Sequence, residues 1–302
     1  MSAFYCISGR KGTMVYLSIF TFPNDEMEFD FFLKVKRTCY DVFYPFRVLS
    51  RHNFERIDFE PITILYGGNG SGKSTALNVI AEKTGINRDS IYNKSNFYSD
   101  YTNMCGMHLE ADIPENSRII TSDDVFDYML NVRNLNEGID QKRDKLFEEY
   151  LDAKYSQFQM KSLSDYELLK TVNMARSKTQ SRFVRKKLMS NVREYSNGES
   201  AFLYFTEKIT DNGLYILDEP ENSLAPKRQM ELMKFIEDAA RFWNCQFIIS
   251  THSPFLLALR GAKIYDLDEN PVDVKRWTKL ENVQTYYEFF KRYEEDFSKI
   301  PD

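Results

Sequence analysis

The sequence predicts an α/β fold in which a parallel sheet is combined with an N-terminal antiparallel β lobe and a helical insertion. Three observations predict it. A glycine-rich segment at 67–74 stands between an apolar strand and a helix. From residue 213 onward, short apolar strands alternate with helical segments, as in proteins built on a parallel sheet. Between about 122 and 193 the pattern changes to long, polar, helical stretches.

The N-terminal part, 1–121, is expected to hold the β lobe and the first piece of the core. Met14–Phe22 and Phe31–Arg37 flank the turn-prone segment Pro23–Asp25, which predicts an antiparallel hairpin. A further pair of strands is expected before residue 67, ending with Ile62–Tyr66.

The rest of the chain is predicted to form a helical subdomain at 122–194 and the second part of the core at 195–302. Three apolar strands are predicted in this second part: Leu214–Leu217, Gln246–Ser250 and Lys263–Leu267. A helix is expected to begin at Pro226, and a C-terminal amphipathic helix is expected over 281–299.

Length and composition are typical of a cytoplasmic protein. The chain has 302 residues, 42% hydrophobic and 28% charged, which suits one large or two modest domains. A formal net charge of −5 means that nucleic-acid binding would need a local basic patch. Four cysteines without C-x-x-C spacing predict reduced thiols and no zinc site. With no secretion signal and no membrane span in the pattern, we expect no membrane contact.

Gly67–Ser74 fits the phosphate-binding pattern G-x-x-x-x-G-K-[ST]. Glycines let backbone N–H groups wrap a triphosphate, and the following helix N-terminus adds the positive end of a dipole. We expect Lys73 to reach the β- and γ-phosphates of ATP and the Ser74 hydroxyl to ligate Mg²⁺. The residues predicted to bind the nucleotide are Gly67, Asn69, Gly70, Ser71, Gly72, Lys73, Ser74 and Thr75. The sequence therefore predicts a P-loop NTPase core.

Two further strands end in polar residues. Asp218 and Glu219 follow the apolar strand at 214–217, where Asp218 is placed to hold Mg²⁺ and Glu219 to deprotonate the attacking water. His252 follows the apolar segment Phe247–Ile249 and can hydrogen-bond the γ-phosphate or the water. We predict Lys73, Glu219 and His252 as the catalytic residues. The plainer alternatives are an acidic loop and a histidine satisfied by its own turn.

A serine-rich segment precedes the apolar helix Ala201–Phe205. Ser196 and Glu199 form the capping-box pattern S-x-x-E. The same segment leaves a positive helix end and free N–H groups at Gly198, which suits a phosphate anion.

Taken in order, these motifs resemble those of ABC-class ATPases, and specifically their small non-transporter branch. That branch includes ATPases of the SMC type, nucleases of the overcoming-lysogenisation-defect type and stand-alone "AAA family" predicted ATPases. The segments that carry the resemblance are Tyr195–Ser200 (signature), Leu217–Pro226 (Walker B and D-loop), Thr251–Pro254 (switch histidine) and Asn53–Pro61 (lead-in to the phosphate loop). Together they cover about half of the chain, 46–85 and 190–260.

The resemblance implies an ATPase that uses ATP and Mg²⁺ and works as a homodimer with ATP at the interface. Ser196 and Gly198, with Glu199 beside them, would contact the γ-phosphate bound by the other protomer. The chain departs from the family pattern because no glutamine lies near the expected Q-loop. Ser122 or Asp123 is the candidate for that contact, and the missing glutamine argues against a transporter ATPase.

The biological role is a separate prediction. We expect an ATPase subunit that switches a separate protein effector in bacterial anti-phage defence, because the sequence shows no nuclease or metal cluster of its own. The alternative is a DNA- or RNA-repair ATPase that acts through nine basic residues between Lys161 and Arg193. A nucleotide-dependent scaffold without turnover is the third possibility. Four residues are candidates for adenine contact, although core or strand packing is the favoured interpretation of each: Tyr44, Phe46, Arg47 and Phe54.

Overall fold

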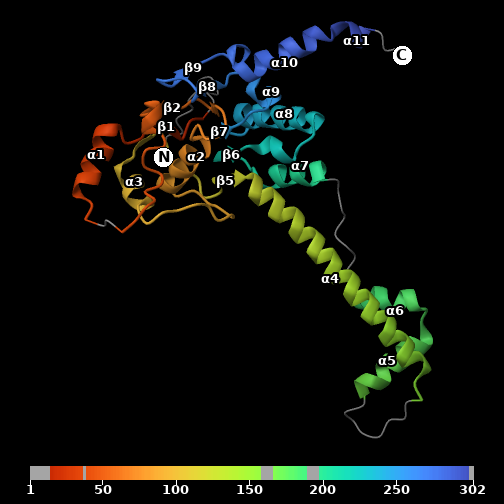
Figure 1. Ribbon diagram of the computed structural model, residues 1–302. Helices are drawn as coiled ribbons and strands as arrows, with labels where there is room; N and C mark the ends of the chain where they lie inside the picture. The colour runs from red at the N-terminus through yellow and green to blue at the C-terminus, as the bar shows by residue number, and fades with distance from the viewer. Residues whose placement is uncertain (1–13, 37–38, 158–165, 189–196, 299–302) are drawn as a thin grey trace, which may run out of the picture. The chain divides into compact units, whose positions relative to one another are not determined.

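The computed structural model describes residues 14–36, 39–157, 166–188 and 197–298. Residue contacts divide the chain into two compact units. One unit combines Met1–Val125 with Asn197–Asp302, and the other is Phe126–Ser196. Figure 1 shows the elements of both units in chain order.

The first unit is built on a six-stranded sheet in the order β5-β6-β7-β3-β8-β9. Its strands are β3 (Ile62–Tyr66), β5 (Arg118–Thr121), β6 (Gly213–Asp218), β7 (Cys245–Ser250), β8 (Lys263–Asp266) and β9 (Asp273–Val274). All neighbours pair in parallel except β8 and β9. The predicted α/β fold with a parallel sheet is therefore confirmed, and the carboxyl ends of β3, β6, β7 and β8 share one edge.

Helices pack on this sheet. The three that matter for the site are α2 (Lys73–Thr84), α7 (Asn197–Lys208) and α8 (Pro226–Phe242). Helix α2 contacts β6 and β7, and α8 contacts β7 and the short α9 (Pro254–Leu257). Helix α2 ends at Gly85, whose left-handed backbone (φ 68°) suits glycine at a helix C-terminus.

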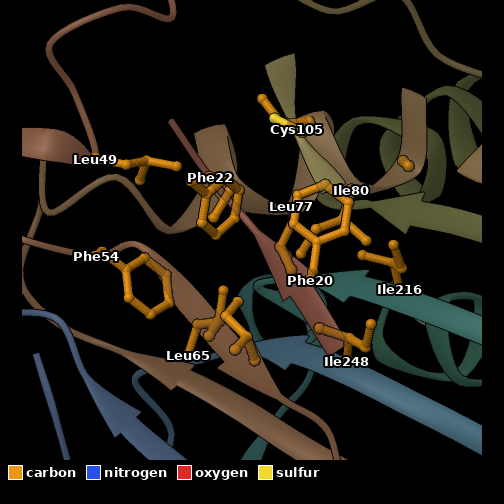
Figure 2. Packing of buried hydrophobic residues seen from close by; sticks show 14 of the residues in the cluster. Phe20, Phe22, Leu49, Phe54, Leu65, Leu77, Ile80, Cys105, Ile216 and Ile248 are labelled. Carbon is orange, nitrogen blue, oxygen red and sulfur yellow. The ribbon is translucent and has the colours of Figure 1, made fainter. Parts of the chain in front are cut away.

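A second, antiparallel sheet has the order β2-β1-β4, with β1 at Leu17–Thr21, β2 at Arg56–Asp58 and β4 at Gly106–Leu109. It shares one hydrophobic core with α2, α3 (Tyr98–Met104) and the larger sheet. Figure 2 shows side chains of this core, among them Phe20 of β1, Leu77 of α2 and Ile248 of β7. Because Phe20 and Leu77 are fully buried, the N-terminal β lobe and the helix behind the phosphate loop are packed as one body.

The predicted hairpin of Met14–Phe22 with Phe31–Arg37 is wrong in its second strand. Residues Asp25–Lys34 form helix α1, and β1 pairs with β2 and β4 instead. Asn24 caps the helix by accepting a hydrogen bond from the Met27 N–H at 2.9 Å. Three acids in the first turn add a favourable interaction with the helix dipole. The local capping signal thus outweighs the alternating apolar pattern.

The described part of the second unit is helical. Helix α4 (Ser122–Tyr155) begins with residues of the first unit, and from Phe126 onward its residues belong to the second unit. Its other helices are α5 (Tyr166–Ser177) and α6 (Gln180–Lys187). Residues from all three helices form a small core of their own: Leu146, Tyr150, Ala153, Val172, Ala175, Phe183 and Val184. A helical insertion was predicted, and helices are what this part of the chain forms.

The single C-terminal helix expected over 281–299 is two helices over the described residues. Helix α10 (Glu281–Arg292) stops at Tyr293, whose backbone (φ −104°, ψ 16°) leaves the helical region. Helix α11 (Glu294–Ser298) follows at once, with three acids in its first turn that favour a new helix N-terminus.

Replacing the cap of α1 tests the corrected N-terminal fold. We expect Asn24→Ala to destabilise α1 by about 1 kcal/mol, because the Met27 N–H loses its acceptor. Hydrogen exchange of the α1 amides should then be faster by roughly fivefold. Asn103→Ala, in an exposed position of α3, is the matched control and should leave exchange in α1 unchanged. Equal exchange in Asn24→Ala and the parent would contradict the cap.

Candidate functional site

The loop between β3 and α2 has the backbone that the glycine pattern predicts. Gly67, Gly70 and Gly72 have φ of 153°, 85° and 94°, values that side chains with a Cβ rarely adopt. A Cβ on Gly72 would lie 2.8 Å from Leu49 Cδ2. Because Gly72 also begins α2, only glycine fits where the loop passes into the helix.

Lys73 lies in the centre of this loop. Its Nζ donates to the carbonyls of Gly67 at 2.7 Å and Gly68 at 3.0 Å. Burial lowers the pKa of Lys73, and the nearby carboxylates of Glu219 and Asp218 oppose that shift. The ammonium group has three N–H donors, and the loop carbonyls use two of them. A buried cation on a glycine-rich loop at the start of a helix fits a phosphate.

The other predicted loop residues surround this centre. Ser71 is 5% exposed, and its Oγ has no hydrogen-bond partner among the described residues. Thr75 Oγ1 accepts a hydrogen bond from the Tyr44 hydroxyl at 3.1 Å. Asn69 and Gly70 are exposed at the mouth of the loop.

Asp218 at the end of β6 joins this strand and β7 to α2. Its Oδ1 accepts hydrogen bonds from Ser74 Oγ at 3.1 Å and from Ser250 Oγ of β7. Burial raises the pKa of Asp218, while the two serine hydroxyls and Lys73 counter that shift. A serine hydroxyl and a carboxylate are oxygen ligands of the kind that Mg²⁺ prefers. Ser74 and Asp218 therefore fit the predicted metal-binding pair.

Glu219 has a strained backbone, with φ 48° and ψ 54°. Its N–H donates to Ser250 O at 3.1 Å and Ser250 Oγ at 3.0 Å, which holds the chain in this left-handed turn. Its Oε2 accepts from Asn222 Nδ2 at 3.0 Å, and its Oε1 lies 3.5 Å from His252 Nε2. Backbone strain of this kind is commonest at functional sites.

His252 is fixed through its backbone and keeps one ring nitrogen unengaged. Its N–H donates to Glu221 Oε1 at 2.6 Å, and its carbonyl accepts from Asn282 Nδ2 at 2.6 Å. Nε2 is buried without a hydrogen-bond partner among the described residues, because 3.5 Å to Glu219 is too long for a good bond. Burial lowers the pKa of His252, and the Lys73 charge lowers it further. At pH 7 the ring is neutral and can donate or accept a proton.

Asp268 is a site residue that the sequence reasoning missed. Both of its carboxylate oxygens accept the Gly68 N–H, at 2.8 and 2.7 Å, so the loop is tied to the segment after β8. Ser250, Glu221 and Asn282 were also missed, although they hold Asp218 and His252 in place. Asp268 could have been found, because it follows an apolar strand as Asp218 does.

The predicted signature residues are only partly described. Ser196 lies outside the described residues. Gly198 and Glu199 stand in the first turn of α7, and Glu199 Oε1 pairs with Arg228 Nη2 of α8 at 3.1 Å. Contact of these residues with a second protomer remains a prediction.

Two of the four adenine candidates belong to the core. Phe46 and Phe54 are 5% and 2% exposed and pack in the shared core. The Arg47 guanidinium lies 4.6 Å from the centre of the Phe32 ring. Tyr44 stays a candidate for adenine contact, because its hydroxyl reaches Thr75 and it lines a cavity of about 740 Å³.

The Q-loop candidates Ser122 and Asp123 stand directly after β5. Thr121 lies opposite Asp218 in the parallel register, so this turn is next to the metal-binding pair. Asp124, 5% exposed, accepts the Thr121 N–H at 2.7 Å and caps the start of α4. The assignment of Ser122 or Asp123 to the magnesium side stays a prediction.

The lowered pKa of His252 can be measured. We expect the NMR titration of His252 to have its midpoint below the ordinary value of 6.5, since burial and Lys73 disfavour the protonated ring. The native protein should therefore lose stability as the pH falls through 6.5, where unfolded chains take up the proton. Lys73→Met should move the midpoint back toward 6.5. A midpoint above 6.5 in the parent would contradict this expectation. The double variant His52→Gln with His108→Gln removes the other two histidines of the chain, so that the remaining signal belongs to His252.

Comparison with known proteins was made for the whole chain. Residues 55–222 match the family model described as "ABC transporter", which is more than half of the chain. Residues 190–258 match a second model, described as "AAA domain, putative AbiEii toxin, Type IV TA system". No protein of the curated set matches the sequence.

Several solved structures are similar to this chain. The Smc head domain of Pyrococcus furiosus, bound to the C-terminal domain of ScpA, is 13% identical, with 79% of this chain and 95% of that chain covered and a TM-score of 0.37. The SMC head domain of Thermotoga maritima is 13% identical, with 87% and 99% covered and a TM-score of 0.38. A nucleotide-free ATP-binding cassette from an ABC transporter is 16% identical, with 77% and 87% covered and a TM-score of 0.38.

Among the described residues, no helix combines the length and apolar character needed to cross a bilayer.

Proposed function

Because this chain belongs to the ABC transporter family, and so to a class of ATP-hydrolysing enzymes, we propose that it is a Mg²⁺-dependent ATPase whose nucleotide-driven homodimer switches a protein effector. One observation carries the proposal. Lys73, Asp218 and His252 come from three separate segments, and strand ends at one edge of the parallel sheet bring them to a single place. The following steps derive what these residues do.

The first step is binding. Lys73 and the loop amides take the β- and γ-phosphates. Ser74 and Asp218 would hold Mg²⁺, which would neutralise charge on the phosphate oxygens. Burial makes the Lys73 cation costly and lowers the pKa of its ammonium group. A triphosphate relieves that cost, which favours the bound state.

The second step is hydrolysis. Glu219 accepts a proton from water as the water oxygen attacks the γ-phosphorus, and the bond from the γ-phosphorus to the bridging oxygen breaks to give ADP and phosphate. His252 Nε2, without a partner among the described residues, hydrogen-bonds the γ-phosphate. Asn222 Nδ2 orients the Glu219 carboxylate at 3.0 Å.

The third step is the switch. The predicted trans contact places Ser196, Gly198 and Glu199 of one protomer on the γ-phosphate held by the other. ATP would then stabilise the dimer and its hydrolysis would release it, because the nucleotide favours the state that binds it more tightly.

The proposed pathway is bacterial anti-phage defence, with output from a separate effector. Support comes from the match of residues 190–258 to a family model whose description names a toxin of a type IV toxin–antitoxin system. Such a system consists of two partners, a toxin and an antitoxin.

Glu219→Gln tests the ATPase proposal. We expect turnover to fall by roughly 10²–10⁴-fold, because the water loses its base. ATP binding should persist, since Lys73, Ser74 and Asp218 are unchanged. In saturating ATP and Mg²⁺ the variant should sediment as a dimer, and without nucleotide as a monomer.

The matched control is Glu115→Gln, an exposed glutamate in the first unit, which should keep full turnover. Undiminished turnover in Glu219→Gln would remove Glu219 as the base. A variant that stays monomeric with ATP would exclude the nucleotide sandwich.

The alternative function, nucleic-acid binding through the basic insert, has one supporting observation. Four bases of α5 and α6 are exposed: Lys170, Arg176, Arg182 and Arg185. The end residues of the predicted patch, Lys161 and Arg193, lie outside the described residues.

A salt series tests this alternative. If the insert follows a phosphate backbone, duplex DNA or RNA should bind with log K falling by about 0.9 per phosphate contact for each unit of log salt. Arg182→Ala with Arg185→Ala should weaken binding and flatten that slope, while Lys36→Ala in the first unit should change neither. Salt-independent binding, or none, would exclude the alternative.

A further inference from the structure

The last two helices, α10 and α11 (Glu281–Ser298), form a segment that we call the C-terminal arm. The arm is attached to the first unit at its start, where Leu280 is fully buried and Val283 is 7% exposed. From Gln284 to Ser298 every residue is exposed. Figure 1 shows α10 and α11 following β9 to the end of the drawn chain. A helix of this length without packing is marginal in water.

The arm carries a concentration of exposed aromatic side chains. Six of them are 43–61% exposed: Tyr286, Tyr287, Phe289, Phe290, Tyr293 and Phe297. Their rings gather, with centroids 5.0 Å apart for Phe289 and Tyr293 and 6.1 Å apart for Phe290 and Phe297. A contiguous apolar patch of this kind marks an interaction surface rather than scattered surface residues.

The spacing of the aromatic residues identifies the shape of the partner. Within α10, Val283, Tyr286 and Phe290 follow one another at intervals of three and four residues. This is the spacing of the seam through which one helix packs against another or lies in a helical groove. The ring contact of Phe290 with Phe297 continues this apolar side onto α11.

The charges of the arm identify the chemistry of the partner. Five acids against two bases give the arm a net charge of −3. Three of the acids, Glu294, Glu295 and Asp296, form the first turn of α11, whereas both bases, Lys291 and Arg292, lie in the last turn of α10. An anionic bilayer would be repelled, and a second copy of the arm would bring like charges together. A basic partner satisfies the acids at the start of α11 and the net negative charge of the arm.

We infer that the C-terminal arm is the docking surface for a protein that presents a basic, apolar helical groove. The inference rests on the proposed function, because the protein that docks on the arm is taken to be the effector that the ATPase switches. The first turn of the arm reaches the nucleotide site. Asn282 Nδ2 donates to the His252 carbonyl at 2.6 Å, and the Asn282 N–H donates to the Tyr66 hydroxyl at 3.2 Å. A partner on the arm thus acts on the residue next to the γ-phosphate position.

The test uses the full chain and two labelled 18-residue peptides with the same leucine seam, one flanked by lysines and one by glutamates. We expect the lysine peptide to bind at least tenfold more tightly, and its binding to weaken with salt. The triple variant Tyr286→Ser, Phe290→Ser, Phe297→Ser should lose binding. Phe29→Ser, an equally exposed aromatic on α1, is the matched control and should keep it.

Charge reversal gives the second arm of the test. Glu294→Lys with Asp296→Lys should reverse the preference between the peptides, and Glu55→Lys with Glu115→Lys should not. Equal affinity for both peptides, or binding that survives the triple variant, would overturn the inference. So would arm-dependent dimerisation without nucleotide, or arm-dependent binding to vesicles of phosphatidylcholine and phosphatidylglycerol.

The experiment separates this inference from the proposed ATPase. Glu219→Gln should bind the lysine peptide as the parent does, because the arm is untouched. Peptide binding by a parent that shows no ATP turnover would refute the proposed function and leave the docking surface intact.

Discussion

The hydrogen bonds of Asp218 hold the candidate site together. One carboxylate oxygen receives the hydroxyls of Ser74 and Ser250, so a helix start and two strand ends meet at a single atom. The parallel register of β6 with β7, and of β7 with β3, sets the height at which these groups meet. A shift of one residue in β6 or β7 would turn Asp218 or Ser250 to the other face of the sheet. The geometry of the loop, of Glu219 and of His252 follows from that register.

The larger sheet could be predicted because its strands are buried on both sides. Ile62–Tyr66 is buried throughout, and so is Cys245–Ser250, and such continuous apolar runs are typical of parallel strands. The phosphate loop was equally predictable, since its glycines are needed for positive φ and for the close approach of Leu49. In both cases a local physical requirement leaves few residue types possible.

Other elements depend on contacts that a sequence pattern does not show. Helix α1 has alternating apolar residues and reads as a strand, yet Asn24 and the acids behind it begin a helix. Glu28 of that helix is 2% exposed and accepts the Arg47 N–H at 2.8 Å from a distant loop. Asn282 belongs to no motif, and its role appears only when the start of α10 lies beside His252.

Strand β8 ends in a buried, ion-paired acid next to the residue that holds the phosphate loop. Asp266 is 4% exposed and pairs with Lys275 at 2.9 Å, close to Asp268, which holds the loop. A buried acid with a partner resists displacement, because separating the pair would leave an uncompensated charge. The phosphate loop is therefore anchored on a segment that is itself electrostatically fixed.

At residue 219, the left-handed backbone conformation favours glycine, while the proposed catalytic role needs a glutamate. A glutamate there gives up about 1–2 kcal/mol of conformational free energy that glycine would keep. Selection for stability alone would favour glycine at this position, whereas the proposed hydrolysis requires the glutamate carboxylate. At position 219, the residue that would make the fold most stable and the residue that the proposed catalysis needs are therefore different.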